Sequence, residues 1–318
     1  LALGPDAAEI DLPPDPVITE ADREAFHARP EITAIRLLAE IDADYLFRVF
    51  MYHFDDEMQT DAEQAMLADI ATEFLRVREQ VRAAKAARMQ GTTLATRAYP
   101  VISLPSDAPV FPEAALTHSV IRQETEFHQQ AVSRAGARGI MQMMPATARA
   151  TARDLGVQYN YEWLTDDTDY NLRLGMAHLN EVVEEYDGSL VMALAAYNAG
   201  GHRVDQWVAR YGDPRTGAID PIDWVESIPF AETRSYVQRV LENLGVYRAR
   251  MSDGEQARLF IERDMTGAAA QVQLPSLPPL TTFETDAAPA GEREAEPEAD
   301  AAPAGGADAE EAAEGESE

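Results

Sequence analysis

Residues 113–128 read EAALTHSVIRQETEFH and carry apolar side chains at helical spacing. Leu116, Val120 and Glu124 are four residues apart, and Phe127 follows Glu124 by three, so a helix over 113–128 places the Glu124 carboxyl group on its own apolar face. Burial disfavours the charged form of a carboxyl group and raises its pKa. A raised pKa is what a general acid near neutral pH requires.

The Glu124 carboxyl group has a second interpretation. A half-buried glutamate can simply pair with an arginine, such as Arg122 or Arg138. Glutamate is rarely fully buried without a partner or a function, so this stretch alone favours neither interpretation. Glu126 projects to another side of the helix and does not share the apolar stripe.

A glycine-containing turn at 133–139 precedes the apolar run IMQMM at 140–144. Pro145 suits the first turn of a helix, and Gly156 suits its C-terminal cap. Gln142 is the one polar residue of the apolar run. A buried amide needs hydrogen-bond partners, which a sugar can supply. A methionine-rich core is the simpler interpretation of this segment on its own.

Two later segments place polar side chains at helix ends. Residues 190–201 form an apolar helix that ends in AAYNAGG, with Tyr197 and Asn198 directly before the glycines. Tyrosine can stack on a sugar face and asparagine can bond to hydroxyl or acetamido groups. Farther on, Pro229 interrupts the chain and a helix follows. Glu232 lies in its first turn, where the helix dipole favours an acid whether or not it has another role.

Together these segments resemble the soluble lytic transglycosylases, a family whose catalytic module has a goose-lysozyme-like fold. The resemblance rests on RQETEF at 122–127, AGARGIMQMMP at 135–145, AAYNAG at 195–200 and IPFAETRSY at 228–236. The order and spacing of the four motifs agree with the family over residues 100–250.

The resemblance implies that Glu124 is the catalytic acid. It implies saccharide contacts from Thr125, Ser133, Gln142, Met144, Tyr197, Asn198 and Glu232. Thr125 stands where the family usually has serine, and it keeps the hydroxyl group. Gly201-His202 replaces the Pro-Gly that often follows the AAYNAG motif, which affects the shape of that loop.

The implied activity is cleavage of the MurNAc-GlcNAc β-1,4 bond of peptidoglycan with formation of 1,6-anhydro-MurNAc ends. Glu124 would act as both acid and base, and no cofactor or metal would be needed. Two alternatives stay open: a hydrolytic, lysozyme-type muramidase, and a non-catalytic peptidoglycan-binding scaffold. The sequence does not distinguish cleavage at strand ends from internal cleavage, and it does not give the oligomeric state.

The expected fold is all-α, with a lysozyme-like domain preceded by a short α-superhelical region. The expected parts are an N-terminal arm (1–18), a helical region (19–99), the lysozyme-like transglycosylase domain (100–250), a C-terminal extension (251–283) and a disordered acidic tail (284–318). Apolar periodicity predicts three or four antiparallel helices between residues 19 and 90. By its resemblance, this region looks like the last part of a longer superhelix.

Composition excludes several classes of function. The net charge is −30 and no basic stripe is visible, which argues against nucleic acid as a partner. The absence of cysteine excludes disulfides and thiolate metal sites. The histidines show no paired metal-ligand spacing, and His118 and His128 are expected at the surface or in a groove. No apolar run is long enough for a transmembrane segment. No signal-peptide pattern is visible, so a periplasmic location is inferred from the substrate alone.

Overall fold

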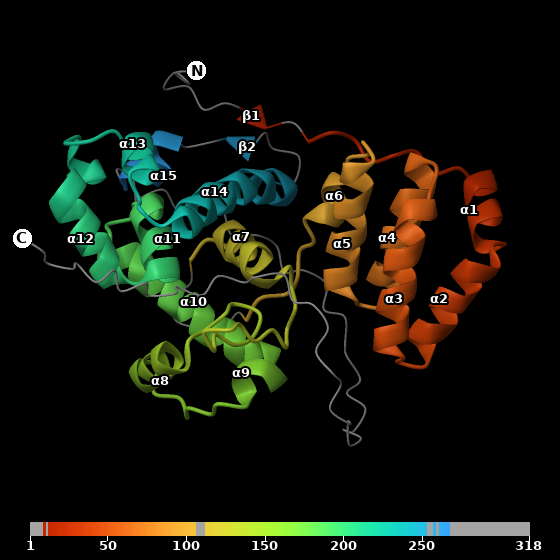
Figure 1. Cartoon of the computed structure of the whole chain (residues 1–318), viewed down its shortest axis with the longest axis horizontal. Coiled ribbons are helices and arrows are strands. Elements are labelled where there is room, and N and C mark those ends of the chain that lie inside the picture. Colours follow the sequence, from red (N-terminus) through yellow and green to blue (C-terminus); the bar gives the residue numbers. More distant parts are fainter. Residues whose placement is uncertain (1–8, 11, 106–111, 253–256, 259–260, 268–318) are drawn as a thin grey trace, which may run out of the picture. The chain divides into compact units, whose positions relative to one another are not determined.

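The computed structural model describes residues 9–10, 12–105, 112–252, 257–258 and 261–267 (Figure 1). Within these ranges the chain is predominantly helical, and its two strands, β1 (Glu9–Ile10) and β2 (Ala257–Arg258), are two residues long and pair antiparallel. The prediction of an all-α fold is confirmed. The acidic tail expected at 284–318 lies outside the described residues.

The helices form two compact units. The first contains the described parts of 1–102, 111–128 and 238–263, and the second those of 103–110, 129–237 and 264–318. Both units are discontinuous in sequence, because α7 (Ala114–Thr125) and most of α14 (Ala231–Met251) belong with the N-terminal helices. The domain ranges derived from the sequence run consecutively along the chain, and they stay predictions.

The first unit begins with five helices, where the sequence predicted three or four. They are α1 (Glu20–His27), α2 (Pro30–Glu40), α3 (Asp44–Phe54), α4 (Asp61–Glu73) and α5 (Val77–Met89), with the short helices η1 (Asp55–Glu57) and α6 (Ala95–Ala98). The predicted number was too low because left-handed residues end helices without a glycine or proline signal. Asp42 follows α2 with φ 53°, and Leu75 follows α4 with φ 57°.

Apolar packing and capping explain why these segments form helices. Thr19 and Thr60 make capping boxes at the starts of α1 and α4, each with the acid three residues on. One buried cluster fills the space between α1, α2, α3 and α4; its largest fully buried members are Phe26, Ile32, Ile35, Phe47, Met51, Met58, Leu67 and Ile70.

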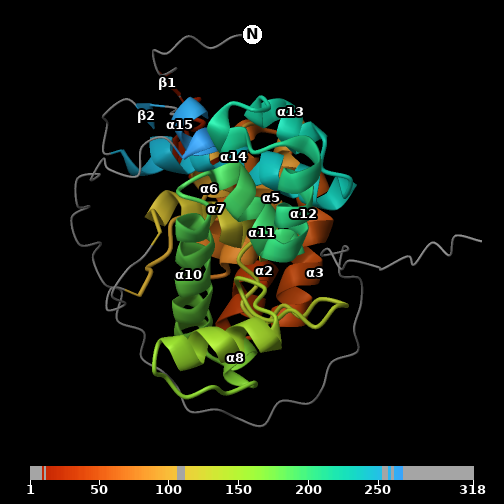
Figure 2. The same ribbon diagram turned by 90° about the vertical axis from the view of Figure 1, so that its left-hand side faces the viewer.

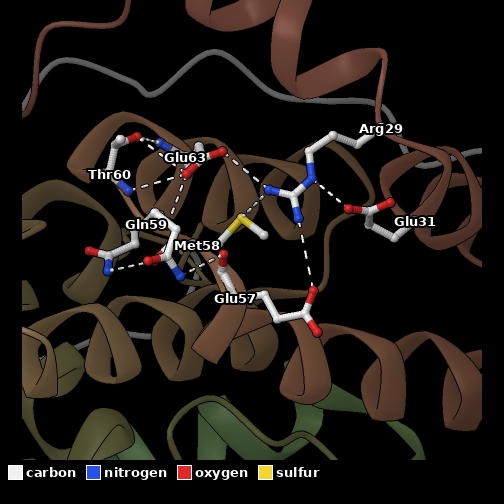
Figure 3. Close-up of polar contacts among 8 residues, drawn as sticks. Arg29, Glu31, Glu57, Met58, Gln59, Thr60 and Glu63 are labelled. Atoms are coloured by element: carbon white, nitrogen blue, oxygen red, sulfur yellow. Dashed lines mark hydrogen bonds and ion pairs between the residues drawn. The ribbon is translucent and has the colours of Figure 1, made fainter.

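A polar network ties the start of α2 to the start of α4 (Figure 3). The guanidinium group of Arg29 donates to Glu31 Oε1 at 2.6 Å and to Glu63 Oε1 at 3.1 Å. The second oxygen of Glu63 accepts the backbone N–H groups of Gln59, at 2.8 Å, and Thr60, at 3.2 Å. The two bonds of Arg29 are partly buried, and the two bonds to Glu63 satisfy backbone N–H groups at the start of α4.

The second unit is built around α10 (Thr168–Glu185). It contains α8 (Pro145–Asp154), α9 (Trp163–Asp166), α11 (Leu190–Ala199), α12 (Gly201–Tyr211), η2 (Pro214–Thr216), α13 (Pro221–Glu226) and the first turns of α14. The short helix α15 (Ile261–Thr266) spans the sequence boundary between the units. Helices α8, α9 and α11 contact α10, which stands upright above α8 in Figure 2. Gly156 follows α8 with φ 69°, as predicted for its C-terminal end.

Candidate active site

Helix α7 carries Glu124 and Thr125 as its last two residues. Both side chains are partly buried, and the Thr125 hydroxyl donates to the Ile121 carbonyl at 3.3 Å. The sequence predicted a helix as far as residue 128, but it ends at Thr125 because Glu126 and Phe127 are left-handed, with φ 51° and 69°. Glu124 is therefore at a helix end, and it does not lie in the middle of a helix.

Buried contacts anchor α7 within the first unit. Arg122 lies over the Tyr99 ring at 4.1 Å, and its guanidinium group donates to Ala98 O at 2.9 Å and to Asn243 Oδ1 at 3.2 Å. His118 is only 1% exposed and packs on the ring of Tyr247 at 5.3 Å. The expectation that His118 lies at the surface is wrong. Burial lowers its pKa, so it is neutral at neutral pH.

The chain beyond α7 is tied to α5 by Glu126. Its carboxylate accepts a short hydrogen bond from Lys85 Nζ and lies 3.3 Å from Arg82 Nε. Burial alone would raise the pKa of Glu126, but Lys85, Arg82 and Arg122 hold it below its usual value. Glu126 is therefore an ionised structural residue that fixes the end of the helix bearing Glu124.

In the second unit, Asn171 organises the loop that carries Gln142. The amide nitrogen of Asn171 donates to Arg138 O and Leu164 O, both at 2.9 Å, and its oxygen accepts the Met141 N–H group at 3.0 Å. Asn171 is 1% exposed, and all of these contacts are needed to satisfy it. Asn171 is not among the residues predicted from the sequence, although an asparagine between Tyr170 and Leu172 on an apolar helix is a usable signal.

The Gln142 side chain is held by its own loop. Gln142 has a left-handed backbone conformation, with φ 51°. Its side-chain amide nitrogen donates to Gly139 O at 2.9 Å and to Ala131 O at 3.3 Å. Backbone carbonyl groups therefore satisfy the amide nitrogen of Gln142, and its contact with a sugar stays a prediction. Ser133 is buried in the same loop, where its hydroxyl accepts the Ala137 N–H group at 3.0 Å.

The end of α11 joins this loop to α14. The Tyr197 hydroxyl donates to Met141 O at 2.8 Å, and the Tyr197 ring lies 5.4 Å from the ring of His178. Asn198 Oδ1 accepts a hydrogen bond from Thr233 Oγ1 at 2.7 Å. Thr233 is buried in the first turn of α14 and was missed by the sequence analysis.

The predicted site residues are thus divided between the units. Glu124 and Thr125 belong to the first unit; Ser133, Gln142, Met144, Tyr197, Asn198 and Glu232 belong to the second. Within the second unit, hydrogen bonds link the Gln142 loop to Tyr197 and link Asn198 to α14. Met144 is 43% exposed, and Glu232 is exposed beside Thr233. The roles assigned to all eight residues remain predictions.

Two other features are absent from the described residues. No group of three or more His, Cys, Asp or Glu side chains is placed to hold a metal ion. No helix in the described part of the chain has both the length and the apolar character needed to cross a membrane.

Two protein families match the chain. Residues 112–219 match the transglycosylase SLT domain, and residues 227–256 match the soluble lytic transglycosylase helical domain. The second match contains the whole of α14, and the helical region expected at 19–99 stays a prediction. The first match contains α7 and the loop of Gln142.

Curated relatives are lytic transglycosylases. A putative soluble lytic murein transglycosylase of Haemophilus influenzae is 36% identical over 147 residues, which are 46% of this chain and 24% of the relative. The soluble lytic murein transglycosylase of Escherichia coli K12 is 36% identical over 136 residues, 42% of this chain and 20% of the relative. The chain therefore spans about a fifth to a quarter of the length of these relatives.

Solved structures share the fold. The 70 kDa soluble lytic transglycosylase from Escherichia coli superposes with a TM-score of 0.63 at 28% identity, over 80% of this chain and 40% of that chain. An inactive Glu-to-Gln mutant of the lytic transglycosylase Slt from Pseudomonas aeruginosa superposes with a TM-score of 0.62 at 26% identity. The superposition covers 78% of this chain and 40% of that chain. The predicted fold class is confirmed, and residues 112–219 and 227–256 of this chain match the two domain models of the soluble lytic transglycosylases.

Proposed function

We propose that this chain is a peptidoglycan lytic transglycosylase with Glu124 as its single general acid and base. The observation that carries the proposal is the position of Glu124. Its side chain is partly buried at the end of α7, inside the segment that matches the SLT domain. Buried aromatic rings hold α7, and the ion pairs of Glu126 hold the residues directly after it. A carboxyl group held in such a place can exchange a proton with a bound substrate without moving its backbone.

The relatives support both the reaction class and the use of a glutamate. Two relatives that are 36% identical to this chain are named soluble lytic murein transglycosylases, one of them putatively, and one similar structure is a complex of such an enzyme with bulgecin A. The Pseudomonas aeruginosa relative is described as inactive when one glutamate is changed to glutamine. Peptidoglycan is therefore the proposed substrate, and the periplasm, where that polymer lies, is the proposed location.

In the proposed mechanism Glu124 donates one proton to the substrate and then takes one proton from it. Glu124 protonates the glycosidic oxygen between MurNAc and GlcNAc, and the C1–O bond breaks while the neighbouring acetamido group supports the positive charge at C1. The ionised Glu124 then takes the proton from the C6 hydroxyl group, and the C6 oxygen bonds to C1. The product is a 1,6-anhydro-MurNAc end, and no water is consumed. Acid–base assistance of this kind contributes about 10²–10⁴ in rate.

The saccharide contacts are proposed for residues that the second unit holds in fixed positions. Tyr197 and Asn198 are fixed through Met141 and Thr233, so the Tyr197 ring and the Asn198 amide N–H groups have defined directions. A ring of this kind stacks on a sugar face, and an amide bonds to hydroxyl or acetamido groups. Thr125, Ser133, Gln142, Met144 and Glu232 complete the proposed set.

The test is digestion of purified sacculi by the wild-type protein and by Glu124→Gln, followed by mass analysis of the soluble products. We expect anhydro ends from the wild type, and a loss of at least about 10²-fold in rate from the variant, because glutamine can neither donate nor accept the proton. Glu40→Gln, an exposed glutamate on α2, is the matched control and should keep the wild-type rate.

The outcomes separate the proposal from its alternatives. Reducing ends would identify a hydrolytic muramidase. Binding to sacculi without any release of muropeptides would identify a non-catalytic scaffold. A fully active Glu124→Gln variant with an unchanged unfolding midpoint would remove Glu124 from the mechanism.

A further inference from the structure

One face of α10 carries three residues that contact Met141 and Tyr197. Asn171, Gly175 and His178 are spaced by four and then three residues, so they follow one another along a single face of the helix. Asn171 Oδ1 accepts the Met141 N–H group at 3.0 Å. At Gly175 a Cβ atom would lie 2.5 Å from Met141 Sδ, so the glycine allows Met141 to pack closely against α10. The third residue of the stripe, His178, lies against Tyr197.

The Tyr197 side chain is held at its hydroxyl end by Met141. The hydroxyl group donates to Met141 O at 2.8 Å and lies 3.9 Å from Met143 Sδ. The hydroxyl oxygen of a tyrosine lies on the axis about which the ring turns, so this hydrogen bond fixes where the ring points but leaves its plane free. The torsion about that axis, χ2, has only a broad preference of its own. Contacts with the ring faces therefore have to set the plane.

The His178 ring supplies such a contact. The centres of the His178 and Tyr197 rings are 5.4 Å apart, and the two planes are inclined at 33°. The separation lies within the range in which aromatic rings attract one another. His178 belongs to α10 and Tyr197 to α11, and these two helices pack against each other. The plane of the Tyr197 ring is thus constrained from a neighbouring helix.

A carboxylate orients the His178 ring in turn. His178 Nδ1 lies 3.2 Å from Glu181 Oε2, three residues farther along α10. A carboxylate only accepts hydrogen bonds, so Nδ1 is the donor. The side chains of His178 and Glu181 are 21% and 64% exposed, and a pair as exposed as this contributes little to stability. Its effect is to define the orientation of the imidazole ring that faces Tyr197.

We propose that His178 is a positioning residue, which sets the plane of the Tyr197 ring for stacking on a sugar of the glycan strand. This inference rests on the proposed function, in which Tyr197 contacts the saccharide, and adds a residue that acts through Tyr197. A sugar stacks on an aromatic ring when the two planes are parallel. A ring whose plane is already defined loses less conformational freedom when the sugar binds, and the affinity is higher for that reason.

The first experiment measures the initial rate of muropeptide release at a series of sacculus concentrations. We expect His178→Ala to raise the apparent KM about two- to tenfold, the range that corresponds to one aromatic pair, and to leave kcat within about twofold. His178→Phe keeps a ring at the same position and should restore most of the wild-type KM. A residue needed only for folding would lower the unfolding midpoint without this separation of KM from kcat.

A double-mutant cycle tests whether the effect passes through Tyr197. Isothermal titration measures the binding of a peptide-free GlcNAc–MurNAc tetrasaccharide in the Glu124→Gln background, which prevents turnover. His178→Ala should weaken this binding about two- to tenfold. In the Tyr197→Ala protein it should cause no further loss, because the ring that it positions is gone. The matched control is His53→Ala, which removes an exposed histidine with a glutamate partner, Glu57 at 3.9 Å, and should keep the full affinity.

An independent measurement follows the Tyr197 ring without any ligand. In protein labelled at the tyrosine ring carbons, NMR gives the rate at which the Tyr197 ring turns about its axis, and Tyr197→Phe assigns its signals. We expect faster turning in His178→Ala than in the wild type, because a contact with the ring face is lost. The rate in His178→Phe should be close to that of the wild type. This experiment tests the ring contact separately from saccharide binding.

Three results would overturn the inference. One is a folded His178→Ala variant with the wild-type KM and the wild-type affinity for the tetrasaccharide. Another is an undiminished effect of His178→Ala in the Tyr197→Ala background, which would mean that His178 acts independently of Tyr197. The third is an unchanged turning rate of the Tyr197 ring in His178→Ala. Failure of the proposed function itself is recognised separately, by the absence of soluble products when the wild-type protein is incubated with sacculi.

Discussion

Gly139 shows how a single residue fixes the loop that carries Gln142. It has φ 77°, and a Cβ atom there would lie 2.0 Å from Leu164 O and 2.1 Å from Asn171 Nδ2. Asn171 cannot move away without losing its bonds to Arg138 and Leu164. The glycine is therefore required both for its backbone conformation and for the close approach of Asn171.

We expect Gly139→Ala to lower the free energy of unfolding by about 2–4 kcal/mol, from backbone strain together with overpacking. Gly136→Ala is the matched control, because Gly136 also has a positive φ, 88°, but nothing lies within 4 Å of its Cβ position. That variant isolates the strain and should lose only about 1 kcal/mol. Chemical denaturation measures both; equal losses would show that the contact with Asn171 does not matter.

At this scale the sequence predicted some residues and not others. Tyr197 and Asn198 stand beside glycines at a helix end, a local pattern that can be read directly. Thr233 and Asn171 satisfy polar groups of segments more than 30 residues away. The position of Asn171 on an apolar helix marks it as a candidate, but the groups that Asn171 and Thr233 bond to depend on how helices pack and cannot be read from a local pattern.

Helices were predicted more reliably than their ends. The starts of α8 and α14 follow proline signals, and Gly156 ends α8 as expected. The end of α7 was misplaced because Glu126 adopts a left-handed conformation that its residue type does not announce. Its ion pairs with Lys85 and Arg82, 41 and 44 positions earlier in the sequence, accompany that conformation. The burial of His118 likewise depends on Tyr247 in α14, which the sequence does not place beside α7.

Two residues that follow helices of the first unit, His128 after α7 and Asp55 after α3, should contribute to the pH dependence of stability in opposite directions. Burial, and then nearby arginines, lower the pKa of His128 after α7 to about 4, below its usual 6.5. The unfolded chain then binds more protons between these values, so stability falls as the pH drops from 6.5 towards 4. Burial, and then Asp56, raise the pKa of Asp55 at the end of α3 from 3.8 to about 6. That contribution is present below pH 3.8 and is lost as the pH rises through 6.

We therefore expect Asp55→Asn to raise the free energy of unfolding at pH 7, and His128→Gln to weaken the loss of stability between pH 6.5 and 4. Each effect is at most about 3 kcal/mol, and smaller where water screens the partly exposed group. Urea denaturation at a series of pH values measures both. A His128→Gln variant with the same pH profile as the wild type would show that His128 is not among the arginines when the protein is in solution.

At the scale of the whole molecule, the net charge is the property that can be counted directly from the sequence. The net charge is −30, and residues 284–318 contribute thirteen acids against one arginine. Peptide-bearing glycan strands carry carboxylates, so the proposed substrate and the chain repel each other over distances set by the Debye length.

We therefore expect the initial rate on sacculi to rise as the ionic strength increases from 0.01 to 0.15 M, because the Debye length falls from about 30 Å to about 8 Å and the repulsion is screened. Deletion of residues 284–318 should raise the rate at low salt and weaken its dependence on ionic strength, because it removes thirteen acids and only one arginine. Release of soluble muropeptides measures both proteins. A rate that falls as the salt concentration rises would show that repulsion between the chain and its substrate does not limit the reaction.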